Sequence, residues 1–223
     1  MFRKFCGGVV LFAAGVAGAG AAGAADLAVK APAYKAPPAI LSDWAGFYIG
    51  VNGGYGWDES LTISRVNDNN QFLGNFPVSP KGGLVGGHVG YNWQYGSVVA
   101  GIEIDADGAD IKGTDPGHTV TLKTDELASA RGRLGYAVLP NLLAYGTAGA
   151  GLAHSTIATA NAPTVATSQV GWVAGAGLEY KFWGTFIARA EYLHYDFGEA
   201  STTHAYNFIE KVDIVRGGLS YKF

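Results

Sequence analysis

The sequence predicts an all-β fold: an eight-stranded antiparallel up-and-down β-barrel that crosses a membrane. Three observations indicate it. Apolar and polar side chains alternate with a period of two residues, the connections alternate between short and long, and charges lie opposite an apolar face rich in aromatic residues. Only 15% of the 223 residues are charged, which is low for a water-soluble protein.

The composition also argues against other classes of protein. After the first two dozen residues, no apolar run approaches the roughly 18 residues that a membrane-spanning helix needs. Glycine is abundant, with 34 residues, and aromatic residues make up 13% of the chain, so strands are expected instead. The formal net charge is −3, which gives no reason to expect nucleic-acid binding.

The first 24 residues have the features of a secretory signal peptide. Arg3 and Lys4 supply positive charge, residues 5–16 form an apolar core, and residues 22–24 read Ala-Gly-Ala. This order is typical of a cleaved signal, and we place the cut after Ala24. A cut one residue later is the alternative. The protein is therefore expected to leave the cytoplasm.

Two further segments follow the signal peptide. Residues 25–43 combine proline and alanine with lysine and show no period, which predicts an extended periplasmic linker. Residues 44–223 behave as one unit, the barrel domain. The single cysteine, Cys6, lies inside the signal peptide, so neither a disulfide nor thiol chemistry is expected in the mature protein.

The barrel domain divides into segments that alternate in polarity. In residues 85–95, for example, Val89, Tyr91 and Trp93 share one face, whereas the residues between them are small or polar. Tight turns are expected at residues 95–97, 140–141 and 183–184, and long polar loops at 58–82, 108–123, 155–167 and 199–209. The facing of residues 141–154, mostly alanine and glycine, is the least defined. The eight predicted strands cover about 44–57, 83–95, 97–107, 124–139, 141–154, 168–182, 185–198 and 210–223.

The polarity of the two faces favours a membrane barrel over a soluble one such as a lipocalin. A soluble barrel buries its apolar face, whereas here charges of both signs gather on one face and should meet in the narrow interior. The predicted lumen cluster consists of Glu103, Asp105, Arg131, Arg133, Glu179, Lys181, Arg189, Glu191 and Arg216. His88 should also face the interior.

Aromatic residues on the opposite face gather toward the two ends of the strands, as in the interfacial belts of membrane proteins. The belt at the turn end is predicted to contain Trp93, Tyr95, Tyr136, Tyr145, Phe182, Phe186, Tyr221 and Phe223. The belt toward the loop end is predicted to contain Tyr55, Trp57, Trp172 and Tyr192.

Several segments resemble one known family. Residues 44–57 (WAGFYIGVNGGYGW), 131–136 (RGRLGY), 189–198 (RAEYLHYDFG) and 217–223 (GGLSYKF) are similar to strands of OmpA-like and opacity-type outer-membrane β-barrels, and more closely to the small porin-family surface proteins of alphaproteobacteria. The resemblance implies an eight-stranded barrel in the outer membrane of a Gram-negative cell, often a surface antigen. It implies no single activity, because members serve as structural proteins, adhesins or narrow pores.

The sequence therefore favours a non-enzymatic outer-membrane barrel with a structural and surface-interaction role in the cell envelope. In this interpretation the lumen cluster is a structural ionic plug. A porin-like channel for small solutes, with the cluster as its constriction, is the first alternative. An outer-membrane hydrolase using a serine and His154 or His194 is the second, although no motif supports it. No catalytic residue, metal site or cofactor is predicted.

The expected partners are outer-membrane lipid, the outer-membrane assembly machinery and an extracellular ligand of unknown identity. Leu219, Tyr221 and Phe223 alternate along the last strand, and the chain ends on the aromatic residue. This ending resembles the recognition signal of the assembly machinery. Because the closing strand leaves an edge unpaired until the barrel is complete, it is a natural docking site by strand addition.

Overall fold

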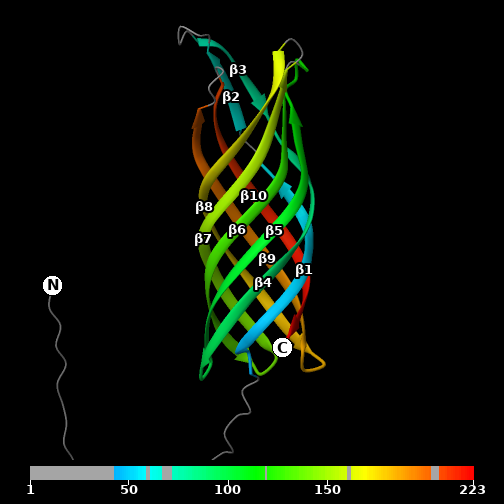
Figure 1. Ribbon diagram of the computed structural model, residues 1–223, viewed down its shortest axis with the longest axis vertical. Helices are drawn as coiled ribbons and strands as arrows, with labels where there is room; N and C mark the ends of the chain where they lie inside the picture. Colours follow the sequence, from blue (N-terminus) through cyan, green and yellow to red (C-terminus); the bar gives the residue numbers. More distant parts are fainter. Residues whose placement is uncertain (1–42, 59–60, 67–71, 119, 160–161, 202–205) are drawn as a thin grey trace, which may run out of the picture. The chain divides into compact units, whose positions relative to one another are not determined.

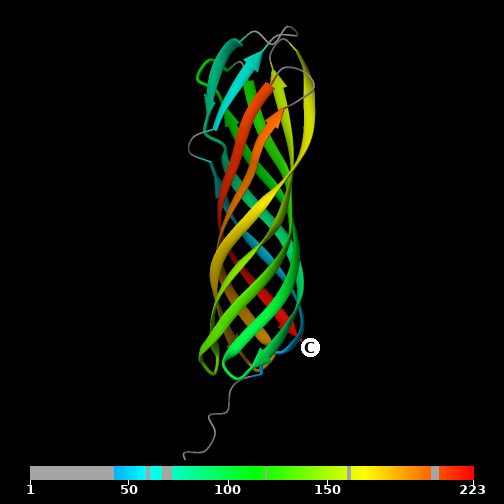
Figure 2. The ribbon, with the colours of Figure 1, turned by 90° about the vertical axis from the view of Figure 1, so that its left-hand side faces the viewer.

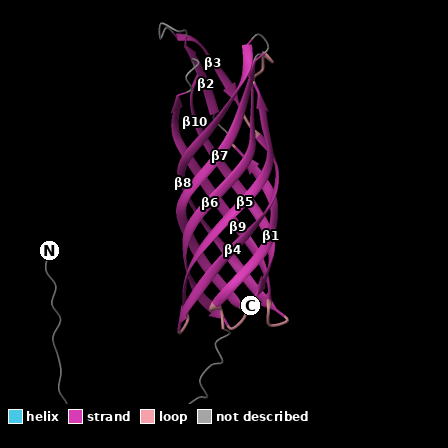
Figure 3. Ribbon diagram, viewed as in Figure 1, coloured by secondary structure: helices cyan, strands magenta, loops and turns pink. Residues whose placement is uncertain are grey.

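The computed structural model describes residues 43–58, 61–66, 72–118, 120–159, 162–201 and 206–223. The predicted signal peptide and nearly all of the predicted linker lie outside the described residues. Described residues form strands joined by turns and loops (Figure 3). No helix in this part of the chain is long and apolar enough to cross a membrane.

Eight strands close into an antiparallel barrel, as predicted (Figure 1). Each strand pairs with the next along the chain, and β1 pairs with β10 to close the ring. The barrel strands are β1 (Gly46–Trp57), β4 (Lys81–Tyr95), β5 (Val98–Thr114), β6 (Val120–Leu139), β7 (Leu142–Thr159), β8 (Ala162–Phe182), β9 (Phe186–Ser201) and β10 (Tyr206–Lys222).

Two additional strands lie in the first predicted loop. β2 (Leu61–Val66) and β3 (Phe72–Val78) pair with each other, and β2 also pairs with the start of β10 through Arg65 and Tyr206. The hairpin lies at the loop end of the barrel (Figure 1). It was not predicted.

The prediction of long polar loops at residues 108–123, 155–167 and 199–209 is wrong. The strands continue through most of these segments, with Thr114 still paired to Thr121 and Ile157 to Val165. The result is a long cylinder (Figure 2). The exposed apolar side chains stop well short of its loop end.

This extension of the strands toward the loop end was missed because the two faces of each strand exchange polarity. Apolar side chains point outward in the part near the turns and inward in the part near the loops. In the half of β5 nearer the turn end, Ile102 and Ile104 are 57% and 61% exposed on the outside, while Glu103 between them is buried. Further along the same strand Ile111 is fully buried, and Asp110 and Lys112 form an ion pair on the outside. The loop end is therefore built like a water-soluble barrel, with an apolar interior and a polar exterior.

The inverted part contains its own apolar core, which we call the outer apolar layer. Its side chains come from seven of the eight barrel strands and lie between the charged interior and the loop end. It contains Leu84, Ile111, Leu127, Ala153, Val173, Leu193, Tyr195, Phe197, Val212 and Ile214. Burying these side chains stabilises the extension through the hydrophobic effect, at about 25 cal/mol per Å² of apolar surface.

The tight turns are confirmed. β8 and β9 are joined through Trp183, Gly184 and Thr185, and the first two have positive φ, at 49° and 80°. Short connections of this length, with glycine at a position of positive φ, are common between twisted antiparallel strands.

Most residues of the predicted aromatic belts lie on the outside, but the prediction for Tyr145 is wrong. Trp93, Tyr136 and Tyr221 are 45%, 57% and 42% exposed, whereas Tyr145 is 6% exposed and points into the barrel. Its neighbours on β7 are mostly alanine and glycine, which gave no polarity contrast from which to assign its face.

Candidate functional site

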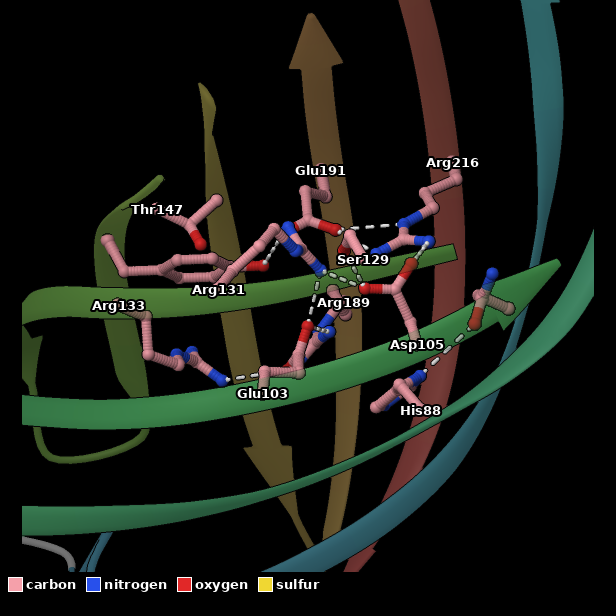
Figure 4. A network of polar contacts seen from close by, with 12 residues as sticks. His88, Glu103, Asp105, Ser129, Arg131, Arg133, Thr147, Arg189, Glu191 and Arg216 are labelled. Carbon is pink, nitrogen blue, oxygen red and sulfur yellow. Dashed lines mark hydrogen bonds and ion pairs between the residues drawn. The ribbon is translucent and has the colours of Figure 1, made fainter. Parts of the chain in front are cut away.

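Four arginines and five carboxylates meet in the middle of the barrel interior. Figure 4 shows the arginines with three of these carboxylates, Glu103, Asp105 and Glu191. Alternation along each strand points these side chains inward, and all are at most 5% exposed. We call this set the lumen network. It comprises Glu103, Asp105 and Asp107 of β5, Arg131 and Arg133 of β6, Glu179 of β8, Arg189 and Glu191 of β9, and Arg216 of β10.

Glu103 is the most heavily contacted carboxylate. The Arg189 guanidinium donates two hydrogen bonds to it, from Nη1 to Oε1 at 2.8 Å and from Nη2 to Oε2 at 2.6 Å. Arg131 Nη2 lies 2.6 Å from Oε1, and Arg133 Nη1 lies 3.5 Å from Oε2. Charge-assisted hydrogen bonds of this kind are shorter and stronger than those between neutral groups.

Arg131 and Arg216 connect three further carboxylates, whereas Glu179 pairs with Arg133 and Arg189. Arg131 also reaches Asp105 at 3.0 Å and Glu191 at 3.0 Å. Arg216 contacts Asp105 at 2.9 Å, Asp107 at 2.7 Å and Glu191 at 2.8 Å. Each guanidinium thus bridges three carboxylates, and the contacts link strands on different sides of the barrel.

Neutral side chains complete the network. The Tyr48 hydroxyl donates to Glu103 Oε2 at 2.7 Å and accepts from Arg133 Nη1 at 2.9 Å. The Tyr145 hydroxyl donates to Glu191 Oε1 at 3.0 Å. These bonds occupy acceptor positions that would otherwise be left unsatisfied away from water.

The structure brings eight of the nine residues of the predicted lumen cluster together. Lys181 lies apart, at the turn end, where its Nζ sits 4.5 Å from the centre of the Trp44 ring and donates to the Asp43 carbonyl oxygen. The prediction used only the parity of β8, and parity cannot give the height of a side chain in the barrel. Asp107 was not included in the cluster, although it follows Asp105 on the same face.

His88 faces the interior, as predicted. One ring nitrogen lies 2.7 Å from Ser220 Oγ and the other 3.2 Å from Asn52 Oδ1. Asn52 in turn donates to Asp107, so the histidine joins the edge of the lumen network through neutral partners.

Apolar side chains close the interior on both sides of the network. The outer apolar layer covers it toward the loop end. Toward the turn end, the Trp44 side chain is buried and packs in a cluster with Val99, Ala137, Leu143 and Ile187. The interior is thus filled by three successive layers, apolar, ionic and apolar.

The two histidines named as alternative bases of a hydrolase have different partners. His154 contacts Ser168, with Nδ1 3.0 Å from Oγ, whereas His194 contacts Asp213, with Nδ1 2.7 Å from Oδ1. The two pairs lie on different strands, β7–β8 and β9–β10. Over the described residues, no three side chains of His, Cys, Asp or Glu gather where they could hold a metal ion.

Comparison with known proteins decides the family. Residues 12–223 match the family described as outer membrane protein beta-barrel domain. The chain belongs to this family. It is an outer-membrane β-barrel protein, and the apolar outer band therefore faces lipid.

Named relatives support the predicted resemblance to alphaproteobacterial surface proteins. The 31 kDa outer-membrane immunogenic protein of Brucella melitensis is 35% identical over 225 residues, covering 90% of this chain and 92% of that protein. The 22 kDa outer membrane protein of Rhizobium leguminosarum is 33% identical, covering 74% of this chain and 70% of that protein.

Among solved structures, the outer membrane protein OprG from Pseudomonas aeruginosa superimposes with a TM-score of 0.57. The alignment covers 82% of this chain and 99% of OprG at 11% identity. This likeness concerns the fold alone.

Proposed function

We propose that this outer-membrane barrel is a non-enzymatic, non-conducting structural protein of the cell envelope that carries a rigid surface extension. The lumen network is then a structural ionic plug, and the loop end is the part that meets the cell's surroundings. The relatives include immunogenic outer-membrane proteins, which is consistent with an exposed surface antigen.

The observation that carries the proposal is the filling of the interior. The charged side chains of the lumen network are all at most 5% exposed and contact one another across the barrel. A channel that selects ions by charge would need such residues to line water. Here they are bonded to each other, and an eight-stranded barrel is just wide enough for its side chains to fill.

Electrical conductance across a planar lipid bilayer tests the proposal. The refolded full-length barrel, with folding checked by its altered gel mobility before heating, is added to the bilayer alongside a known porin. We expect insertion without stable conductance steps. Steps of porin size would contradict the plug and favour the alternative, a narrow channel for small solutes.

A double variant sharpens the measurement. Glu103→Ala with Arg189→Ala removes a central ion pair while leaving the outer apolar layer in place. If the ionic layer and the two apolar layers block the lumen together, this variant should also show no stable conductance steps. Conductance in the variant alone would show that the ionic layer is the only seal.

A further inference from the structure

Two shallow hollows adjoin on the outside of the barrel wall, where the apolar outer band gives way to the polar extension. The first has a volume of about 830 Å³ and lies over β4, β5 and β6. The second, of about 520 Å³, lies over β5 to β8. Because they share Gly108 and Glu126, they form one continuous depression. We call it the interface groove, which runs from Val85 of β4 to Ser168 of β8.

The floor of the interface groove consists of residues with small side chains. Gly83 and Gly108 lie in the first hollow, and Ala106 and Ala128 lie in the second. A Cβ atom added at Gly83 or Gly108 would meet nothing closer than 3.8 Å, so packing within the barrel does not require glycine there. The glycines leave the backbone open to a molecule that lies against the wall.

The side of the groove nearer the turn end is apolar. Val85 and Leu152 border it there and are 69% and 51% exposed. Both side chains belong to the apolar outer band, so the groove is continuous with the surface that faces lipid. A molecule with a polar head in the groove can therefore lay apolar chains along the band.

The side nearer the loop end carries a row of lysines. Lys81, Lys112 and Lys123 lie directly opposite one another on β4, β5 and β6, and all three side chains are on the outside. Like charges in such positions repel each other. Lys112 and Lys123 are partly neutralised by Asp110, at 2.8 and 3.6 Å. Over the described residues Lys81 forms no ion pair, so an anionic group bound beside it would reduce the remaining repulsion.

The groove is not simply basic. Three carboxylates balance the formal charge of the three lysines: Asp110, Asp125 and Glu126. Glu126 is exposed and forms no ion pair within the part of the chain that the structure describes. His154 and Ser168, 3.0 Å apart between Nδ1 and Oγ, add groups that can donate or accept hydrogen bonds. This mixture does not suit a bare phosphate ion. It suits a head that combines anionic groups with hydroxyl and amide groups.

We propose that the interface groove binds one molecule of lipopolysaccharide, the anionic glycolipid of the outer leaflet. Its phosphate would lie beside Lys81 and Lys112, its sugar hydroxyl and amide groups would contact Glu126, His154 and Ser168, and its acyl chains would cover the band below. The inference rests on the proposed function, in which the loop end meets the cell's surroundings.

The width of the groove favours this lipid over a phospholipid. The groove crosses five consecutive strands, β4 to β8. At a spacing of about 4.8 Å between strands, it is roughly 19 Å wide. A disaccharide head that carries several acyl chains can span this distance, whereas the head of a two-chain phospholipid covers only part of it.

Native mass spectrometry of the full-length refolded barrel in detergent tests the site. The barrel is mixed with rough-type lipopolysaccharide or with phosphatidylglycerol, an anionic lipid without a sugar, in EDTA so that divalent cations do not bridge lipid molecules. We expect one lipopolysaccharide to be retained per chain, and at least tenfold less phosphatidylglycerol at equal concentration. An excess of inorganic phosphate should not displace the lipopolysaccharide.

Two variants, each with a matched control, locate the site. Gly108→Leu fills the floor and should lower retention at least tenfold. Its control is Gly132→Leu, an outward position of β6 within the apolar band, where a Cβ atom would meet nothing closer than 3.9 Å. Lys81→Gln should lower retention several-fold. Its control is Lys211→Gln, which alters an exposed lysine of β10 that pairs with Asp196. Gel mobility before heating checks that each variant folds.

Three results would overturn the proposal. Equal retention in Gly108→Leu and Gly132→Leu would show that the lipid coats the apolar band without a site. Equal losses in Lys81→Gln and Lys211→Gln would show that the charge acts without regard to position. Phosphatidylglycerol retained as strongly as lipopolysaccharide would rule out recognition of the sugar head. Retention in detergent is independent of conductance, so a conducting barrel would contradict the closed lumen and leave the lipid result unchanged.

Discussion

Arg189 and Glu103 face each other across the barrel interior and form a two-pronged ion pair, with N–O distances of 2.8 and 2.6 Å. The residues lie on β9 and β5, which are not neighbours in the sheet. The pair therefore braces opposite parts of the wall rather than adding to a hydrogen-bonded ladder. Its geometry matches the planar fork of arginine to the two oxygens of a carboxylate.

Replacing Glu103 with glutamine should destabilise the folded barrel by about 3 kcal/mol or more. The change leaves Arg131, Arg133 and Arg189 with one carboxylate fewer, and breaking a buried pair from one side leaves an uncompensated charge. Arg131→Ala should cost a similar amount for the same reason. Urea unfolding in detergent or lipid measures both.

The matched control is Asp110→Asn on the same strand. Asp110 pairs with Lys112 on the outside, where both side chains are more than half exposed, so its loss should change the free energy of unfolding little. Equal midpoints for Glu103→Gln and the wild type would show that the lumen network is hydrated and adds little to stability.

Gly177 is required for the position of Tyr145. A Cβ atom at residue 177 would lie 2.5 Å from the Tyr145 hydroxyl oxygen, so Gly177→Ala should displace the ring and break its bond to Glu191. We expect a loss of about 1–3 kcal/mol. Gly146→Ala on the adjacent strand is the control, because its Cβ would meet nothing closer than 3.8 Å. Equal effects of the two substitutions would refute the packing argument.

The sequence predicted the barrel and its charged interior because each strand keeps its parity over many residues. Parity assigns a face but not a height, which is why Lys181 was grouped with the lumen cluster. Parity also fails to assign a face where the side chains on both faces are small, as around Tyr145. The apolar interior of the extension could not be recognised while apolar residues were expected to face lipid. Glu210 of β10 is buried at 1% exposure and was missed for that reason, because the apolar Val212 and Ile214 next to it on the same face also point inward.

Trp44 should stabilise the barrel without being the only seal. Its side chain is 1% exposed, its backbone N–H donates to Gln94 Oε1 at 2.6 Å, and Lys181 lies over its ring. Trp44→Ala should cost about 3 kcal/mol through the cavity that it leaves, yet the variant should remain non-conducting. Urea midpoints and planar-bilayer recordings measure the two effects.

Trp183→Ala is the control for Trp44, since Trp183 lies in a turn at the same end and is 86% exposed. It should cost less. The appearance of stable current in Trp44→Ala would mean that the apolar cluster at the turn end, rather than the lumen network, closes the barrel.

Deletion of Phe223 should reduce assembly far more than stability. Phe223 is 75% exposed, its N–H donates to Phe47 O at 3.0 Å, and its ring touches Tyr221. In the finished barrel its loss removes one hydrogen bond at the end of a strand and one ring contact, at a cost of about 1 kcal/mol. During assembly, however, β10 must be held until it pairs with β1, and we propose that Leu219, Tyr221 and Phe223 form the docking signal for the assembly machinery. The yield of folded protein in outer membranes, read from gel mobility before heating, should fall several-fold, while urea midpoints of the barrels that do form change little.

Phe186→Ala provides the comparison: it removes a ring that also contacts Tyr221, at a centroid distance of 5.5 Å, but leaves β10 intact. A normal yield after deletion of Phe223, or an equal loss in Phe186→Ala, would leave Phe223 as a member of the interfacial aromatic belt and nothing more.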